Sequence, residues 1–195
     1  MKTFVIDGVE LPYYFRTRIN SERTVEVALA NWFVDKCPEF VEVGAVLPAY
    51  GVVGHMCYDL CEKRAGVLNV DAETVDYTGL NVLNISTIEH MGKAEYGNTV
   101  LDADKPIRVF CKTLSEAKNY LVTFPAGHDK QLDRFVDNRH KARVLCWSEG
   151  NLWCETDELL TSFGYGQRAP FADAIAVVSN LFNDLHTSQS YANVA

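Results

Sequence analysis

Short apolar runs recur along this chain, separated by polar segments that contain glycine, proline or aspartate. A run without polar alternation is typical of a strand that is covered on both faces. The β-branched and aliphatic residues of these runs favour strand over helix. We therefore expect buried strands at 40–46, 80–87, 119–125 and 169–182.

Segments with helical periodicity lie before and between these runs. In 20–37, apolar side chains recur close to the spacing of one helix face, and Asn20 or Ser21 can cap the first turn. Pro38 then ends the helix. We expect helices at 20–37, 102–117 and 132–142, and a small hairpin at 5–11 whose turn is Asp7-Gly8.

Three further segments have less regular patterns. The segment 55–62 fits either a helix or a strand, and we interpret it as the second strand of the sheet. The segment 66–77 predicts a short third strand that ends near Asp71. The segment 143–160 predicts two strands, joined as a hairpin or a bent strand around 149–150.

The alternation of strands and helices in the middle of the chain indicates an α/β fold. We predict a single domain with a Rossmann-like, doubly wound, mainly parallel sheet and an antiparallel C-terminal edge. Within it, 1–37 forms an N-terminal hairpin and helix extension, 38–183 forms the core, and 184–195 is a flexible tail.

Composition narrows the classes of partner. The chain has 195 residues, of which 48% are hydrophobic, enough for one domain with its own core. Its net charge of −8 gives an acidic surface, so nucleic acid is not expected as a partner. The N-terminal stretch lacks the apolar core of a signal peptide, and no apolar run is long enough to span a membrane. We expect a cytoplasmic protein and leave open whether it forms a homo-oligomer.

The six cysteines occur without C-x-x-C spacing. In an intracellular chain this pattern indicates reduced thiols, most of them buried. Because paired ligand spacing is lacking, no metal site is expected from the sequence.

Polar residues follow the predicted strands where ligands bind in a parallel sheet, beyond the carboxyl ends. They are Glu42 and Gly44, then Asp59, then Asp71, then Ser86, Thr87, Glu89 and His90.

The same segments carry a family resemblance. In order, VEVGAVLPAYG, YDLCEK, GVLNVDAETVDY, LNVLNISTIEHMG and YLVTFPAGHDKQLD resemble class I S-adenosylmethionine-dependent methyltransferases. They are most similar to a poorly characterised branch with an S-x-x-E-H-x-G motif after the fourth strand. The resemblance covers about 20–180, and its most specific part is ISTIEHMG combined with VEVG.

The resemblance implies a cofactor, S-adenosylmethionine, with S-adenosylhomocysteine as product. Glu42 and Gly44 would begin the cofactor loop, since glycine lets the backbone approach closely. Asp59 would accept hydrogen bonds from the ribose hydroxyls. Asp71 would lie beside the adenine amino group.

The resemblance also implies a donor and an acceptor side. Ser86 and Thr87 would end the fourth strand under the sulfonium. His90, with Glu89 second, would be the catalytic base on the acceptor side. Among Arg16, Arg18 and Arg23, we favour Arg23 for the cofactor carboxylate.

The loop GAVLPAYG departs from the family pattern, because it lacks the second and third glycines of the common G-x-G-x-G form. S-adenosylmethionine has no pyrophosphate, so it needs fewer glycines than a dinucleotide does. The segment EHMGKAEYGN also replaces the branch's usual Trp-Asp. That departure puts the identity of the acceptor in doubt.

The residues themselves leave alternatives open. VEVGAVLPAYG is also compatible with a plain buried strand and turn. Asp59 would be a surface charge if 55–62 were helical. His90 can equally be a capping or packing histidine, and Glu89 can orient it, bind substrate or be solvated at a helix start.

Three functions remain in view. The first is methyl transfer to a small-molecule or sugar acceptor. The second is a non-catalytic S-adenosylmethionine-binding or protein-interaction module on the same fold. The third is a nicotinamide-dependent reductase, which the lack of G-x-G-x-x-G disfavours.

Overall fold

The computed structural model describes residues 2–96, 99, 101–140, 142–148, 150–166 and 171–182. A small hairpin is formed by β1 (Thr3–Ile6) and β2 (Val9–Pro12). The main sheet contains β3 (Val41–Val43), β4 (Met56–Tyr58), β5 (Val67–Leu68), β6 (Asn81–Ile85), β7 (Asn119–Pro125), β8 (Arg143–Trp147), β9 (Trp153–Thr156) and β10 (Ala174–Ser179).

The eight strands of this sheet lie in the order β5-β4-β3-β6-β7-β10-β8-β9. Strands β3 to β7 pair in parallel. β10 runs antiparallel between β7 and β8, and β9 runs antiparallel to β8 at the edge. The sheet is therefore mainly parallel, as expected. Its antiparallel part is not confined to the edge, because β10 lies two strands in from the edge strand β9.

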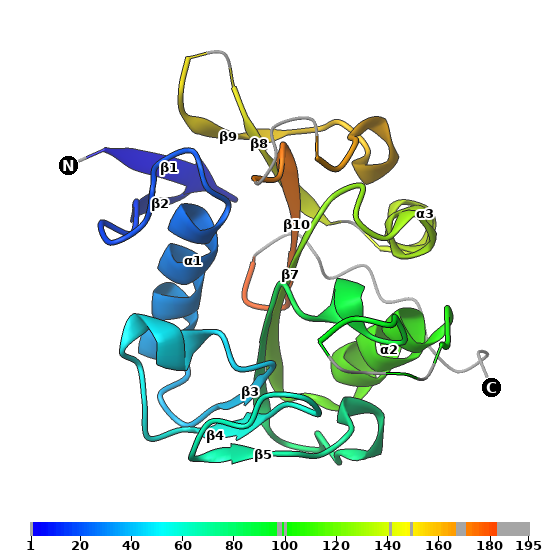
Figure 1. The fold of residues 1–195 in the computed structure, drawn as a ribbon. Helices are drawn as coiled ribbons and strands as arrows, with labels where there is room; N and C mark the ends of the chain where they lie inside the picture. The colour runs from blue at the N-terminus through cyan, green and yellow to red at the C-terminus, as the bar shows by residue number, and fades with distance from the viewer. Residues whose placement is uncertain are drawn as a thin grey trace.

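The helices cover both faces of the sheet (Figure 1). On one face lies α1 (Arg23–Lys36), with the β1–β2 hairpin beside it. On the other lie α2 (Lys105–Glu116) and α3 (Lys130–Arg139). Alternating positions of each strand supply the two cores: in β6, Leu83 faces α1, whereas Val82 faces α2. This confirms an α/β architecture.

The connections between the first three strands of the sheet are short. Between β3 and β4 the chain forms only one 3₁₀ turn, η1 (Leu47–Tyr50), and between β4 and β5 it forms a loop. Parallel strands are usually joined through an α-helix. Strands β3, β4 and β5 are therefore connected by loops and not by helices. The exposed apolar residues of this region include Val53, Met56 and Leu68.

The expected elements are present, most of them with shorter bounds. The exceptions are the hairpin, which spans Thr3–Pro12, and α3, which begins at Lys130. The third strand, expected to end near Asp71, ends at Leu68. The helix expected at 20–37 begins at Arg23, where the Arg23 N–H donates to Ser21 Oγ. The ambiguous segment 55–62 forms strand β4, so Asp59 follows a strand. The segment 143–160 forms the β8–β9 hairpin, although Glu149 in its turn lies outside the described residues. The predicted tail, 184–195, also lies outside them.

The N-terminal extension shares its core with the sheet. Phe4 and Ile6 of the hairpin are buried in the same apolar cluster as Phe33 of α1 and Leu145 of β8. Trp153 of β9 also holds the N-terminal segment to the sheet. Its backbone N–H donates to the Tyr13 hydroxyl at 2.9 Å, and its indole N–H donates to the Ile19 carbonyl at 3.0 Å. Within the described part of the chain, no helix is both long and apolar enough to cross a membrane.

Candidate ligand cavity and functional site

A cavity of about 540 Å³ lies beyond the carboxyl ends of β3, β4, β5 and β6. β3 and β6 are neighbours there, and the next strand along the chain, β4 after β3 and β7 after β6, lies in the opposite direction along the sheet in the two cases. Six of the nine residues singled out in the sequence line this cavity: Arg23, Asp59, Asp71, Ser86, Thr87 and His90. Glu42, Gly44 and Glu89 are not in its lining.

The loop after β3 is held by the two residues that lie behind the cavity. Glu42 is fully buried, and its Oε1 accepts the N–H groups of Val46 and Leu47 at 2.9 and 2.8 Å. Gly44 has φ +89°, and a Cβ there would lie 1.9 Å from Thr87 Oγ1. Both residues therefore shape the loop from behind, and Ala45 and Val46 are the loop residues that line the cavity.

Asp59 lines the cavity directly after β4. Its Oδ1 accepts the N–H groups of Cys61 and Glu62, at 2.8 and 2.9 Å, and its Oδ2 accepts the Ala45 N–H at 3.2 Å. The carboxylate thus ties the β4 loop to the β3 loop. Each carboxylate oxygen has two lone pairs, so Oδ2 can still accept one hydrogen bond from a ligand.

Asp71 lies after β5 and is paired with a lysine from α2. Lys105 Nζ lies 2.5 Å from Asp71 Oδ2, and Oδ1 accepts the Glu73 N–H at the start of a 3₁₀ turn. Burial works to raise the pKa of Asp71, but the hydrogen bonds from Lys105 and Glu73 hold it below its usual value. Lys105 also lines the cavity, and its pairing with Asp71 was not expected from the sequence.

Ser86 is connected to a buried carboxylate that the sequence analysis did not identify. Glu26 of α1 is fully buried and accepts hydrogen bonds from the hydroxyls of Ser86 and Thr123, at 2.5 and 2.9 Å. It also pairs with Arg23 Nη1 at 2.9 Å. Ser86 has the unusual φ of +37°. An acidic residue within the apolar face of 20–37 was the available signal for Glu26.

His90 lies between two carboxylates at the wall of the cavity. Its Nδ1 forms a hydrogen bond with Glu95, and its Nε2 lies 3.5 Å from Glu89 Oε1. Glu89 is fully buried, and neither of its carboxylate oxygens has a hydrogen-bond partner among the described residues. Burial raises the pKa of Glu89 well above its usual value. His90 therefore has a hydrogen-bonded carboxylate partner in Glu95, whereas the adjacent Glu89 is buried without a hydrogen-bond partner among the described residues.

A second histidine packs against His90. The rings of His90 and His128 lie 4.5 Å apart, and Lys93 Nζ lies 3.2 Å from His128 Nδ1. His90, Glu95 and His128 bring their ligand atoms within 4.8 Å of one another, a grouping that could hold a metal ion. The Lys93 ammonium disfavours a second cation at this place, because like charges repel strongly where solvent is partly excluded.

We predict that His128 makes the protein acid-sensitive. Burial, then the charges of Lys93 and His90, lower the pKa of His128 to about 4, against about 6.5 in the unfolded chain. The unfolded chain therefore binds more protons between these values, and stability falls as the pH drops from about 6.5 to about 4. His128→Gln should reduce this loss by about 1 kcal/mol between pH 7 and pH 5, after allowance for solvent screening.

Urea unfolding of both proteins at pH 7 and pH 5 measures this difference. Equal losses of unfolding free energy in the two proteins would show that His128 does not contribute to the acid sensitivity.

Comparison of the chain with protein-family models, curated proteins and solved structures found no match. Any assignment of function therefore has to rest on the geometry of the site itself. It offers one cavity at the carboxyl edge of the sheet, with carboxylates on two of its walls, an arginine, and a histidine held between two glutamates.

Proposed function

We propose that this protein is a Rossmann-like S-adenosylmethionine-dependent methyltransferase that acts on a small-molecule or sugar acceptor. One observation carries the proposal: five of the seven residues assigned to the cofactor, from four separate segments of the sequence, line one cavity. The cavity, at about 540 Å³, lies within the range of about 300–1,000 Å³ that is typical of small-molecule sites.

The order of the strands supports a nucleotide-type cofactor. Counted along the chain, the five parallel strands β3 to β7 lie in the order 3-2-1-4-5. This is the order of the first five strands in doubly wound dinucleotide-binding sheets, which bind their ligands where the order reverses. That reversal falls between β3 and β6, next to Thr87 and Ala45 in the cavity.

The polar groups of the cavity fit the parts of the cofactor. Asp59 would accept from a ribose hydroxyl through its remaining lone pair. Asp71 would lie near the adenine amino group at the far wall. Arg23, whose pKa is raised by Glu26 and Glu89 although burial works against this, stays cationic and suits the methionine carboxylate.

The chemistry required of the protein is mainly alignment, because the sulfonium already activates the methyl group. Holding donor and acceptor in line can lower the barrier by several kcal/mol. A base is needed only when the acceptor loses a proton on reaction. We assign this role to His90, because Glu95 bonds its Nδ1 and orients the ring, which leaves Nε2, 3.5 Å from Glu89 Oε1, as the nitrogen that would take the proton.

A second candidate is a ligand-binding module without turnover. It is favoured by the engagement of both nucleoside-side carboxylates with groups of the chain itself: Asp59 with three backbone N–H groups and Asp71 with Lys105. A protein of this kind would bind S-adenosylhomocysteine or a related nucleoside without transferring a methyl group.

Calorimetric titration with S-adenosylmethionine, S-adenosylhomocysteine and NADH tests the cofactor. We expect micromolar binding of the two adenosyl ligands and none of NADH. Val70 lines the cavity and Leu68, on neighbouring β5, does not, although both are partly exposed at 37% and 47%. Val70→Trp should therefore weaken binding at least tenfold, and Leu68→Trp should leave it unchanged.

No binding of either adenosyl ligand would refute the cofactor assignment, and binding of NADH alone would support the reductase. With binding established, a screen of methyl acceptors separates the two candidates. Retained binding of S-adenosylhomocysteine by His90→Gln, with methyl transfer lost, would identify His90 as the base. Binding without transfer to any acceptor would support the non-catalytic module.

A further inference from the structure

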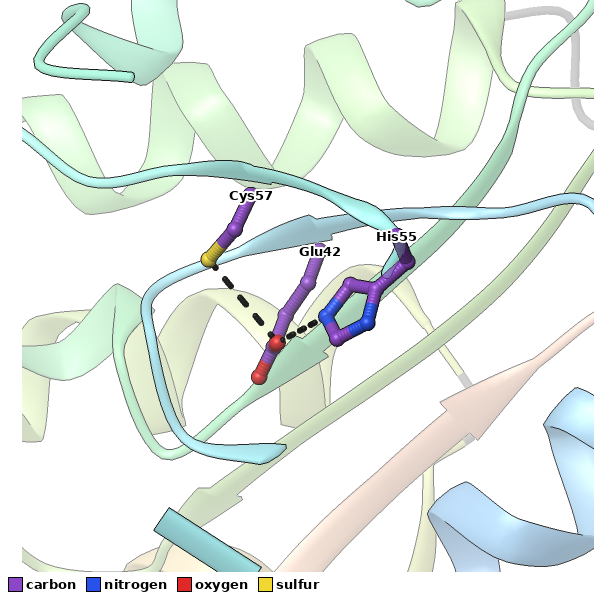
Figure 2. Close-up of side chains that lie close together, drawn as sticks. All are labelled: Glu42, His55 and Cys57. Carbon is purple, nitrogen blue, oxygen red and sulfur yellow. Dashed lines mark hydrogen bonds and ion pairs between the residues drawn. The ribbon is translucent and has the colours of Figure 1, made fainter. Parts of the chain in front are cut away.

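Three potential metal ligands, Glu42, His55 and Cys57, lie close together (Figure 2). Glu42 of β3 and Cys57 of β4 are paired neighbours across the two strands, and His55 directly precedes β4. Val43 and Tyr58, the next residue on each strand, line the cavity. Because successive side chains alternate between faces, Glu42 and Cys57 point away from it.

The three ligand atoms are close and shielded from solvent. Glu42 Oε2 lies 2.7 Å from His55 Nε2 and 3.8 Å from Cys57 Sγ. The exposed fractions of the Glu42 and His55 side chains are 0% and 6%, and Cys57 is 2% exposed. Figure 2 shows that the same carboxylate oxygen faces both partners. One ion could therefore contact all three side chains after small shifts.

We propose that Glu42, His55 and Cys57 form a binding site for one zinc ion. A thiolate, an imidazole and a carboxylate are the ligand types that zinc prefers, and three protein ligands leave a fourth position for water. The mixture of soft and borderline donors disfavours magnesium and calcium, which take oxygen ligands. The site is independent of the proposed methyl transfer.

Surrounding contacts already orient two of the ligands. The N–H groups of Val46 and Leu47 occupy Oε1 of Glu42, which directs Oε2 towards His55 and Cys57. The ring of His55 stacks on Phe40 with its centroid 4.6 Å away. Ligands whose orientation is fixed by such outer contacts lose less freedom when a metal binds.

Binding of the ion requires a change in protonation. Cys57 Sγ faces two acceptors, the Gly44 carbonyl oxygen at 3.4 Å and Glu42 Oε2 at 3.8 Å, so the metal-free site holds a thiol. Zinc would take the place of the Cys57 proton, which passes to solvent. The His55 Nε2 lone pair would bind the ion while its proton moves to Nδ1, a buried atom with no hydrogen-bond partner among the described residues.

The site also has a route to solvent. A surface cavity of about 400 Å³ is lined by both His55 and Cys57. An ion entering through it would join β3, the 44–55 connection and the start of β4. This is a part of the sheet where a loop with one 3₁₀ turn takes the place of a crossover helix. Zinc would therefore stabilise the loop that shapes the ligand cavity.

The test uses the full chain and the metal alone. After treatment with a chelator and dialysis, we expect one equivalent of zinc to bind and to raise the melting temperature. Co²⁺ should bind in its place with the absorption band of a cobalt–thiolate bond. Cys57→Ser should abolish this band and weaken zinc binding at least tenfold, and His55→Gln should weaken zinc binding similarly.

Cys61→Ser is the matched control, because Cys61 lies four residues further on and lines the other cavity. It should keep both the band and the affinity. Thermal melts of the metal-free variants establish that each is folded. The proposal is wrong if the wild-type protein binds less than one equivalent of zinc, if Co²⁺ gives no thiolate band, or if Cys61→Ser loses the band while Cys57→Ser keeps it. None of these results bears on S-adenosylmethionine binding.

Discussion

Gly44→Ala is expected to destabilise the protein by about 3 kcal/mol or more, the sum of left-handed backbone strain and overpacking. Gly44 has φ +89°, and its added methyl group would lie 1.9 Å from Thr87 Oγ1 and 2.7 Å from Thr87 Cβ. Thr87 cannot simply rotate away, because its hydroxyl donates to the Ile85 carbonyl at 2.9 Å. The β3 loop or the β6 loop would have to move.

Gly66→Ala separates the two causes. Gly66 has the same φ of +89°, but a Cβ there would have nothing within 4 Å. It should therefore cost only the backbone strain, about 1–2 kcal/mol. Unfolding free energies from urea titration give the comparison. Equal losses in the two variants would mean that the β3 and β6 loops do not need the close approach seen at Gly44. Because Thr87 lines the cavity, Gly44→Ala should also weaken binding of any ligand there.

Glu26→Ala is expected to cost about 3–5 kcal/mol, the usual loss when one partner of a buried ion pair is removed. The substitution leaves Arg23 without its 2.9 Å carboxylate partner and leaves the Ser86 and Thr123 hydroxyls without their acceptor. Native domains have only about 5–15 kcal/mol of stability in total. The variant should therefore unfold at a much lower urea concentration.

Glu26→Gln and Glu73→Ala make the comparison specific. Glu26→Gln keeps a carbonyl acceptor for the hydroxyls and should lose less stability than Glu26→Ala. Glu73 pairs with Arg108 at 2.5 Å, but its side chain is 34% exposed, whereas that of Glu26 is fully buried. Exposed pairs contribute little, so Glu73→Ala should have a much smaller effect than Glu26→Ala. Similar losses for these two alanine variants would show that the buried network around Glu26 does not hold α1 to the sheet.

Much of the fold was predictable because the signals are local. Apolar runs without alternation identified β3, β6, β7 and β10, and helical periodicity identified α2. The segment 55–62 was ambiguous because β4 has only three residues, too few to establish a period of two. The insertion of β10 between β7 and β8 could not be read from the sequence, since strand order depends on how chain segments cross in space.

The candidate site was predictable only in part. Its strand-end residues, such as Asp59 and Thr87, follow from the rule that parallel strands present their carboxyl ends at one edge. The contacts that site residues make with other helices and strands could not be predicted in this way. Glu26 reaches Thr123 across 97 positions of sequence and Lys105 reaches Asp71 across 34, and neither pairing leaves a local pattern.

The sequence by itself determined the type and succession of the elements, because hydrophobic periodicity reports which face of each segment is buried. The tertiary structure alone decided which charges meet. Glu42 illustrates the difference. Its place on the first strand of the sheet was evident from the sequence, but strand alternation turns it away from the cavity and towards His55 and Cys57. Contacts between such distant residues depend on strand register and on the path of the backbone, which no single segment encodes.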